Sequence, residues 1–224
     1  NPRFWEYQEH HIQDGEREYD LTIFSIVKYF HLCLEGNPNM LDSLFVPESC
    51  VLHSTMVATK VRESRHLFLH QGAIAKFRGY ACSQLHKLKI KNPELGSRRA
   101  QLVEEFGFDS KFASHAMRLL LEAEQLLTTG DLDLQRDKEL LKEVRRGQWS
   151  EKQIIDWFAE MEKSLIPLRV KSDLRPKPNV VGIKALLLEC LEHHYGDLSD
   201  CAPKEDIYKS ALREIRSIME GLTL

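Results

Sequence analysis

The sequence predicts an α+β protein in which one β-strand near the N-terminus is followed by a mostly α-helical region. Residues 18–23 alternate polar and apolar side chains, which is the two-residue period of a half-buried strand. From Ser25 onward, apolar residues recur every three to four positions, which is the period of amphipathic helices. No internal repeat of fixed length is visible.

The predicted strand has one apolar side, formed by Tyr19, Leu21 and Ile23. Aromatic and β-branched side chains of this kind suit a pleated, half-buried surface. Asp20 lies between them on the polar side, so we expect its carboxylate to face away from the core.

Two short helices are expected directly after the strand. Ser25 is a suitable N-cap for the first, and Gly36 supplies its C-terminal stop. Asn37 and Pro38 are typical of an N-cap followed by the first helical residue, so the second helix begins at once. Pro47 ends it.

Longer helices are expected in the middle of the chain. A helical region should cover residues 55–90, with Gly72 and Gly79 as candidate break points, and residues 91–100 form a polar linker. Asp109 can cap a further helix that ends at Gly130.

The C-terminal part of the chain also contains helix start and stop signals. Ser150 and Gln153 have the spacing of a capping box at the start of another helix. A proline-rich connector at 174–179 should lead into a helix that Gly196 ends, and residues 204–222 form a last amphipathic stretch.

Composition limits the class of protein. The net charge of -3 gives no overall attraction to nucleic acid or to an anionic membrane, so any basic surface must be local. No apolar run approaches the roughly 20 residues of a membrane span. The five cysteines lack a Cys-x-x-Cys spacing, which favours a reducing compartment and argues against structural zinc. We therefore expect a soluble, cytoplasmic protein without a membrane partner.

Asp20 has two interpretations from the residues alone. A carboxylate fixed on a rigid strand is a suitable ligand for a hard cation such as magnesium. An aspartate on the solvent face of an edge strand is also a common means of preventing pairing with other chains. Without further information the second interpretation is favoured.

Several linked segments resemble one family of enzymes. They are "YDLTIFSIVKYFHLCLEGNPNMLDSLFVP", "LFLHQGAIAKFRGYACSQLHKL" and "DSKFASHAMRLLLEAEQLLTTGDLDL". In this order they are similar to the polymerase-β-superfamily nucleotidyltransferases of the branch associated with RNA ligases and RNA repair. The resemblance covers roughly residues 15–195.

The resemblance implies a two-metal nucleotidyl transfer from a nucleoside triphosphate (NTP). In such enzymes an Asp-x-Asp pair and a third carboxylate hold divalent ions, usually Mg²⁺, and Asp20 corresponds to the third carboxylate. It would hold the catalytic metal and assist deprotonation of an acceptor hydroxyl, which could belong to an RNA end. This chain would then hold the last strand of a partial nucleotidyltransferase sheet, with residues 1–48 as the C-terminal part of the catalytic core and 49–224 as a helical domain.

One departure from the family pattern affects the prediction of activity. The Gly-Ser turn and the Asp-x-Asp pair of the family precede the third carboxylate, and residues 1–19 contain neither. We therefore expect the first half of the catalytic domain to lie outside this chain.

Three basic residues share one face of the helix that follows Asp109. Lys111, His115 and Arg118 are spaced by four and then three positions. They could bind the triphosphate or the phosphate of the acceptor, with the fork of Arg118 suited to two phosphate oxygens. The alternative is a solvated face in which Glu122 pairs with Arg118. A second group of basic residues consists of Lys87, Lys89 and Lys91. It is either a charged helix face or a nucleic-acid contact.

Two functions of different classes follow. The first is an enzyme that transfers a nucleoside monophosphate from an NTP to a hydroxyl acceptor. The second is a non-catalytic helical adaptor, or one half of a split or degenerate nucleotidyltransferase. In the second case a partner or a missing segment would bind at the exposed edge of the sheet.

Overall fold

The structure is a computed structural model that describes residues 5–89 and 98–198. Within this part of the chain, a two-stranded antiparallel sheet is followed by nine α-helices, which confirms the predicted α+β class. The chain divides into two compact units, Asn1–Leu187 and Leu188–Leu224. The functional boundary expected at residue 48 stays a prediction, and the amphipathic stretch at 204–222 lies outside the described residues.

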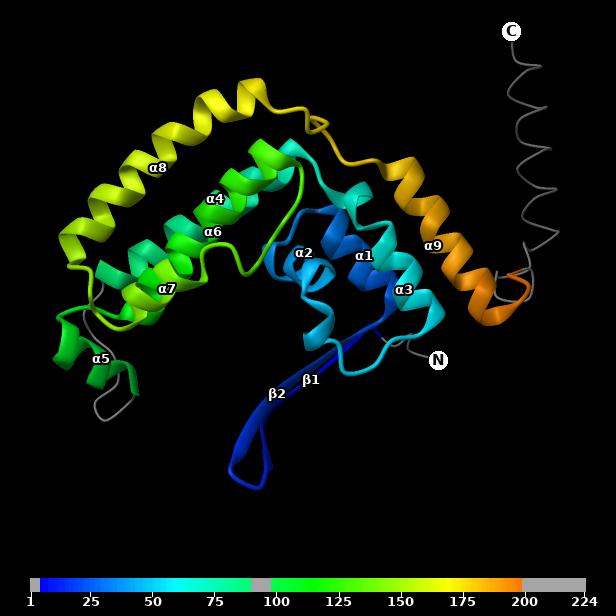
Figure 1. Cartoon of the computed structure of the whole chain (residues 1–224). Helices are drawn as coiled ribbons and strands as arrows, with labels where there is room; N and C mark the ends of the chain where they lie inside the picture. Colours follow the sequence, from blue (N-terminus) through cyan, green and yellow to red (C-terminus); the bar gives the residue numbers. More distant parts are fainter. Residues whose placement is uncertain (1–4, 90–97, 199–224) are drawn as a thin grey trace, which may run out of the picture. The chain divides into compact units, whose positions relative to one another are not determined.

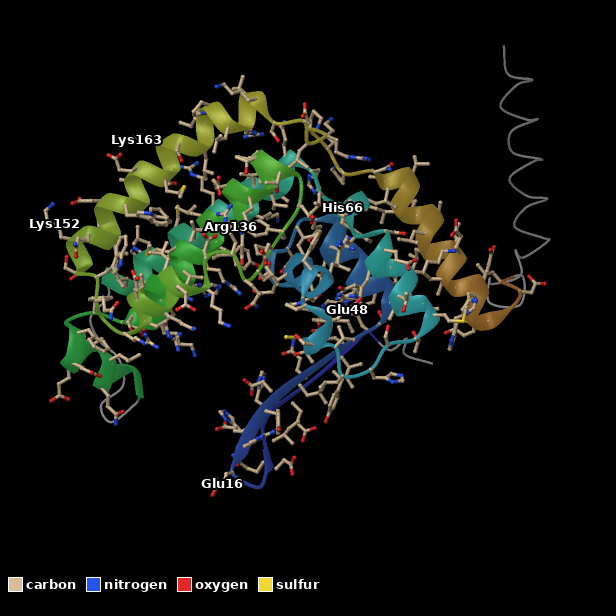
Figure 2. All side chains as sticks on the ribbon, viewed as in Figure 1. Glu16, Glu48, His66, Arg136, Lys152 and Lys163 are labelled. Carbon is tan, nitrogen blue, oxygen red and sulfur yellow. The ribbon has the colours of Figure 1, made fainter. Side chains whose placement is uncertain are left out.

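The sheet is a hairpin of β1 (Glu6–Asp14) and β2 (Arg17–Phe24), which turns at Gly15 with a φ of 63°. Strand β2 confirms the predicted strand, whereas β1 was not predicted. Its sequence, EYQEHHIQD, is almost entirely polar and shows no apolar side. Figure 2 shows side chains projecting from both faces of the hairpin, with Glu16 at its tip.

The expectation of a half-buried strand was wrong. The apolar side of β2 is exposed too, since Tyr19 is 44% exposed and Ile23 is 46% exposed. Tyr7 of β1 is paired with Ile23 and is equally exposed. No described element covers this apolar side. An isolated two-stranded sheet gains little stability of its own, so the uncovered side is suited to further packing.

The caps of the first two helices confirm the sequence interpretation. Helix α1 (Ile26–Leu34) begins at Ser25, whose hydroxyl accepts a hydrogen bond from the Lys28 amide, and Gly36 follows its end with a φ of 73°. Helix α2 (Pro38–Phe45) begins at Asn37, which accepts from the Met40 amide. Both helices bury one apolar side, and α2 also buries Asp42.

The long helical region is broken once. Helix α3 (Met56–Glu63) and the 3₁₀ turn η2 (Arg65–Phe68) precede α4 (Gln71–Lys89). The break thus lies just before Gly72, and Gly79 is within a continuous helix. A shorter 3₁₀ turn, η1 (Glu48–Cys50), lies between α2 and α3.

Helix α6 (Ser110–Thr129) is the central helix of the first unit. It packs along α4, and α7 (Lys138–Arg145) and α8 (Glu151–Lys171) contact it from other sides, as Figure 1 shows. A core of Leu88, Phe108, Met117, Val144 and Ile154 joins these helices. The predicted start at Asp109 and end at Gly130 are both confirmed.

Two further helices were not predicted. Helix α5 (Arg98–Phe106) occupies the end of the expected linker, and α7 begins at Asp137 without a side-chain cap. The capping box of Ser150 and Gln153 at α8 is present as predicted. Helix α9 (Val180–Tyr195) follows the connector and ends at Gly196. Among the described residues, no helix is long and apolar enough to span a bilayer.

Candidate functional site

Asp20 lies opposite a β-bulge in the hairpin. Glu9 pairs with Leu21 and Ile12 pairs with Tyr19, so two residues of β1, His10 and His11, face the single Asp20 of β2. A bulge of this kind bends the strand and changes the direction of nearby side chains and amides. It brings two groups of β1 onto one carboxylate oxygen.

Both histidines contact Oδ1 of Asp20. The backbone amide of His11 donates a hydrogen bond to this oxygen at 3.2 Å, and Nδ1 of His10 lies 3.2 Å from it. The His11 hydrogen bond is the main cause, and His10 the second, of a pKa of Asp20 below its ordinary value. Asp20 is thus an exposed carboxylate held in its ionised form.

The bulge requires an unusual backbone conformation at His11. Its φ of 59° lies in the left-handed region, which residues with a Cβ rarely adopt. The His11 ring contacts the carboxylate of Glu18, which lies on the same side of β2 as Asp20. The polar side of the hairpin therefore carries two carboxylates, each paired with a histidine.

These groups meet only part of the requirement for a divalent cation. Asp20 supplies one ionised oxygen ligand of the type that magnesium prefers. Among residues 5–89 and 98–198, no three acidic, histidine or cysteine side chains are grouped so that they could hold a metal. Asp20 can therefore contribute to a metal site but does not form one with its described neighbours.

The second predicted group lies on α6. Lys111 is exposed at the start of the helix, and His115 and Arg118 follow it as half-buried residues. Helix α4 adds Lys87, whose Nζ lies 5.6 Å from the centre of the Phe112 ring. Burial is the first cause of a lowered His115 pKa, and the charges of Arg118, Lys87 and Lys111 lower it further.

His115 also has an unused hydrogen-bonding atom. Its Nε2 is buried and has no hydrogen-bond partner among the described residues. A buried polar atom without a partner costs free energy, and the nearby positive charges disfavour the protonated, positively charged ring. An anion bound beside His115 would remove both penalties. We call Lys87, Lys111, His115 and Arg118 the basic cluster.

Arg118 is held by two buried carboxylates. Its Nη1 lies 3.4 Å from Oδ2 of Asp42 on α2, and its Nε lies 3.6 Å from Oε1 of Glu122. The side chain of Arg118 is 37% exposed, against 10% for Asp42 and 4% for Glu122. The predicted contact between Arg118 and Glu122 exists, but it is buried rather than part of a solvated face.

Burial shifts the protonation of both carboxyl groups. It raises the pKa of Asp42 to about 6, although the charge of Arg118 acts in the opposite direction. Burial and the nearby charge of Asp42 raise the pKa of Glu122 to about 8, again against the effect of Arg118. At neutral pH the pair therefore holds about one proton.

The structure does not bring Asp20 and the basic cluster into contact. Asp20 bonds to residues of its own hairpin, and the hairpin extends away from α4 and α6 (Figure 1). The connection between them runs through α2, which follows β2 and α1 in the chain and supplies Asp42 to Arg118.

A cavity of about 720 Å³ lies at the end of β2, among α1, α2 and α3. Phe24, Phe30 and Val61 are among its mostly apolar lining, and the hydroxyls of Tyr29 and Ser43 form a hydrogen bond of 2.7 Å beside it. None of the described lining residues is acidic. The cavity therefore lacks the carboxylate ligands that a magnesium ion requires.

Sequence reasoning missed three residues that contact the predicted ones. His10 and His11 lie on a strand without an apolar pattern, so no signal indicated that they face Asp20. Asp42 lies on an apolar helix, and its acidic side chain at a buried position was the available signal. Lys87 was identified as basic, but its position beside His115 depends on how α4 packs on α6.

Comparison with known proteins gives one match. A family model described as the RNA repair pathway DNA polymerase beta family matches residues 6–165, from the start of β1 into α8. No curated protein and no solved structure matches the chain. Because the matched range covers most of its length and includes both predicted sites, the chain belongs to the RNA repair pathway DNA polymerase beta family.

Proposed function

We propose that this member of the family takes part in nucleotidyl transfer, moving a nucleoside monophosphate from an NTP to a hydroxyl acceptor such as an RNA end. The observation that carries the proposal is Asp20, an exposed and ionised carboxylate on a strand inside the matched range. Its carboxylate is oriented by an amide and a histidine from the opposite strand. This is the orientation by neighbouring groups that a metal-binding carboxylate needs.

Magnesium ions, when bound, would activate the attacking hydroxyl and stabilise the pyrophosphate leaving group. Asp20 would be one of their ligands. The proposal requires a Gly-Ser turn and an Asp-x-Asp pair from a polypeptide segment other than these 224 residues. His10 and His11 would keep the Asp20 carboxylate ionised and fixed in direction.

The basic cluster is the proposed phosphate site. Lys111 and Lys87 are exposed cations at its rim, and Arg118 offers guanidinium N–H groups on its half-exposed side. The Nε2 atom of His115 would accept a hydrogen bond from a protonated phosphate oxygen, or donate one when the ring is protonated. Phosphates of the NTP or of the acceptor would both suit this group of charges.

The test is transfer of labelled nucleotide from an NTP to RNA in the presence of magnesium. The wild-type chain and Asp20→Asn are compared, first alone and then with lysate of the source organism, which supplies any missing segment. Loss of transfer in Asp20→Asn with an unchanged circular dichroism spectrum supports the proposal. Equal transfer by the two chains removes Asp20 from the mechanism.

A second function is supported by the uncovered apolar side of the hairpin. Tyr7, Tyr19, Leu21 and Ile23 are all more than 40% exposed. A non-catalytic adaptor, or one half of a split enzyme, would use this side and the strand edges to bind a partner. In that case the chain should bind no nucleotide with magnesium, and Leu21→Arg should abolish association with the partner.

A further inference from the structure

The two buried carboxylates near Arg118 form fewer hydrogen bonds than buried polar groups usually do. Both carboxylate oxygens of Asp42 and the Oε2 of Glu122 have no hydrogen-bond partner among the described residues. The contacts to Arg118, at 3.4 and 3.6 Å, are ion pairs that are longer than charge-assisted hydrogen bonds. Arg118 is therefore held mainly by charge, in a geometry that leaves its guanidinium N–H groups able to bond elsewhere.

The charges around the pair do not balance without a proton. Asp42 and Glu122 face one guanidinium, and the nearby carboxylate of Asp137 is already paired with Arg136 at 2.8 Å. Figure 2 labels Arg136 between α6 and α7. An ionised pair with one arginine would leave one uncompensated negative charge in a buried position, which is strongly unfavourable.

On its other side Arg118 adjoins the rest of the basic cluster. His115 precedes it by one turn of α6, and Lys111 and Lys87 lie beyond His115. These are cations or a proton acceptor, so they repel the guanidinium and attract an anion. Arg118 thus lies between a buried acidic pair and a group that would bind phosphate.

We propose that Asp42 and Glu122 are positioning residues for Arg118, and that the pair takes up a proton when Arg118 engages a phosphate in the basic cluster. The inference rests on the proposed function and concerns the control of the same site. In the ligand-free protein at neutral pH the pair holds one proton, and Arg118 compensates the one negative charge that remains. When the charge of Arg118 is shared with a phosphate, a second proton from solvent neutralises the carboxylate that was still ionised.

The coupling of phosphate binding to proton uptake has two consequences. Binding of an anion becomes tighter as the pH falls, by up to about tenfold per pH unit for one proton taken up. Because Asp42 lies on α2, the occupancy of the phosphate site also changes the contact between α2 and α6. Helix α2 adjoins α1, which directly follows the strand with Asp20.

The probe for the test is inorganic pyrophosphate. Calorimetric titration at pH 7.5 or so, in buffers that differ in ionisation enthalpy, gives the number of protons taken up on binding. The chains compared are wild type, Glu122→Gln and Asp42→Asn. Glu139→Gln is the matched control, because Glu139 is an exposed acidic residue on α7 that pairs with Lys142 at 2.7 Å.

The inference predicts lower proton uptake in Glu122→Gln and in Asp42→Asn than in wild type, with the control equal to wild type. A protein whose acidic pair acts only in folding would change in melting temperature but not in proton uptake. Equal uptake in all four chains would overturn the inference and leave the phosphate site intact. Absence of pyrophosphate binding by the wild type would overturn the phosphate site and the inference together.

A measurement on the wild type alone covers the case in which a variant does not fold. The ¹³C carboxyl signals of Asp42 and Glu122 are titrated with and without saturating pyrophosphate. An upward shift of their titration midpoints on binding supports the inference. Midpoints that do not move while pyrophosphate is bound contradict it.

Discussion

The backbone amide of His11 donates a hydrogen bond to Oδ1 of Asp20 across a two-to-one bulge, at a distance of 3.2 Å. His11 has a left-handed backbone conformation at this bulge, and the hydrogen bond comes from its backbone amide. The histidine ring at this position is not needed to form it. A substitution at position 11 can therefore remove the histidine ring while the amide hydrogen bond to Asp20 stays in place.

Replacing His11 by glycine should strengthen the hairpin. A residue with a Cβ pays roughly 1–2 kcal/mol to adopt the left-handed region, and glycine does not. The amide that bonds to Asp20 remains. We expect slower hydrogen exchange of the β1 and β2 amides, by several-fold, measured by NMR.

Gln13→Gly provides the control for this change. Gln13 pairs with Glu18 in regular strand conformation, where glycine is destabilising. Exchange should therefore become faster in Gln13→Gly. Faster exchange in His11→Gly as well would contradict the bulge as described.

The pH dependence of stability follows from the buried carboxyl groups. Their pKa values in the folded protein, about 6 for Asp42 and about 8 for Glu122, lie above the ordinary values of 3.8 and 4.5. At pH values between the ordinary pKa and the folded-state pKa of each group, the folded state binds more protons than the unfolded state. The free energy of unfolding therefore falls as the pH rises. This part of the stability is present below about pH 4 and is lost by about pH 8.

Glu122→Gln should remove most of this dependence. The amide is neutral at all pH values, so the variant should gain stability over wild type by up to about 1.4 kcal/mol per pH unit between pH 5 and 8. Urea unfolding at three pH values in this range measures the difference. Parallel stability curves for the two chains would contradict the raised pKa of Glu122.

Arg118→Ala should affect stability far more than Lys111→Ala. Removal of Arg118 leaves two buried carboxyl groups without a compensating charge, which should cost up to about 3 kcal/mol at pH 8 and less at pH 5. Lys111 is exposed, so its removal should change stability by less than about 0.5 kcal/mol. Both variants should bind pyrophosphate more weakly. Thermal unfolding at pH 5 and pH 8 measures the loss of stability separately from the loss of binding.

The parts of this fold that the sequence predicts are those specified by local signals. Ser25, Asn37, Asp109 and Ser150 each accept a hydrogen bond from an amide in the first turn of their own helix, so a few neighbouring residues define the start. Helix α7 lacks such a bond at Asp137, and it was missed. Strand β1 was missed because its polar sequence pairs with β2 through the backbone and buries no apolar side.

The candidate site was predictable only in part, for a related reason. The face shared by Lys111, His115 and Arg118 follows from helical periodicity alone. The contact of Arg118 with Asp42 joins two helices that are far apart in the sequence, and it depends on tertiary packing. The same holds for Lys87, which reaches the cluster because α4 packs along α6.

Lys87→Ala should weaken pyrophosphate binding without affecting the fold. Lys87 is an exposed cation on α4 whose charge acts on His115, so its loss removes one attraction for an anion at that point. We expect a Kd about three- to tenfold higher at low salt, with a smaller difference at high salt because exposed charges are screened. Lys163→Ala on α8 is the matched control, because Lys163, which Figure 2 labels, is also an exposed lysine. Calorimetry at two salt concentrations checks the prediction, and equal weakening in both variants would show a general charge effect rather than a site that includes Lys87.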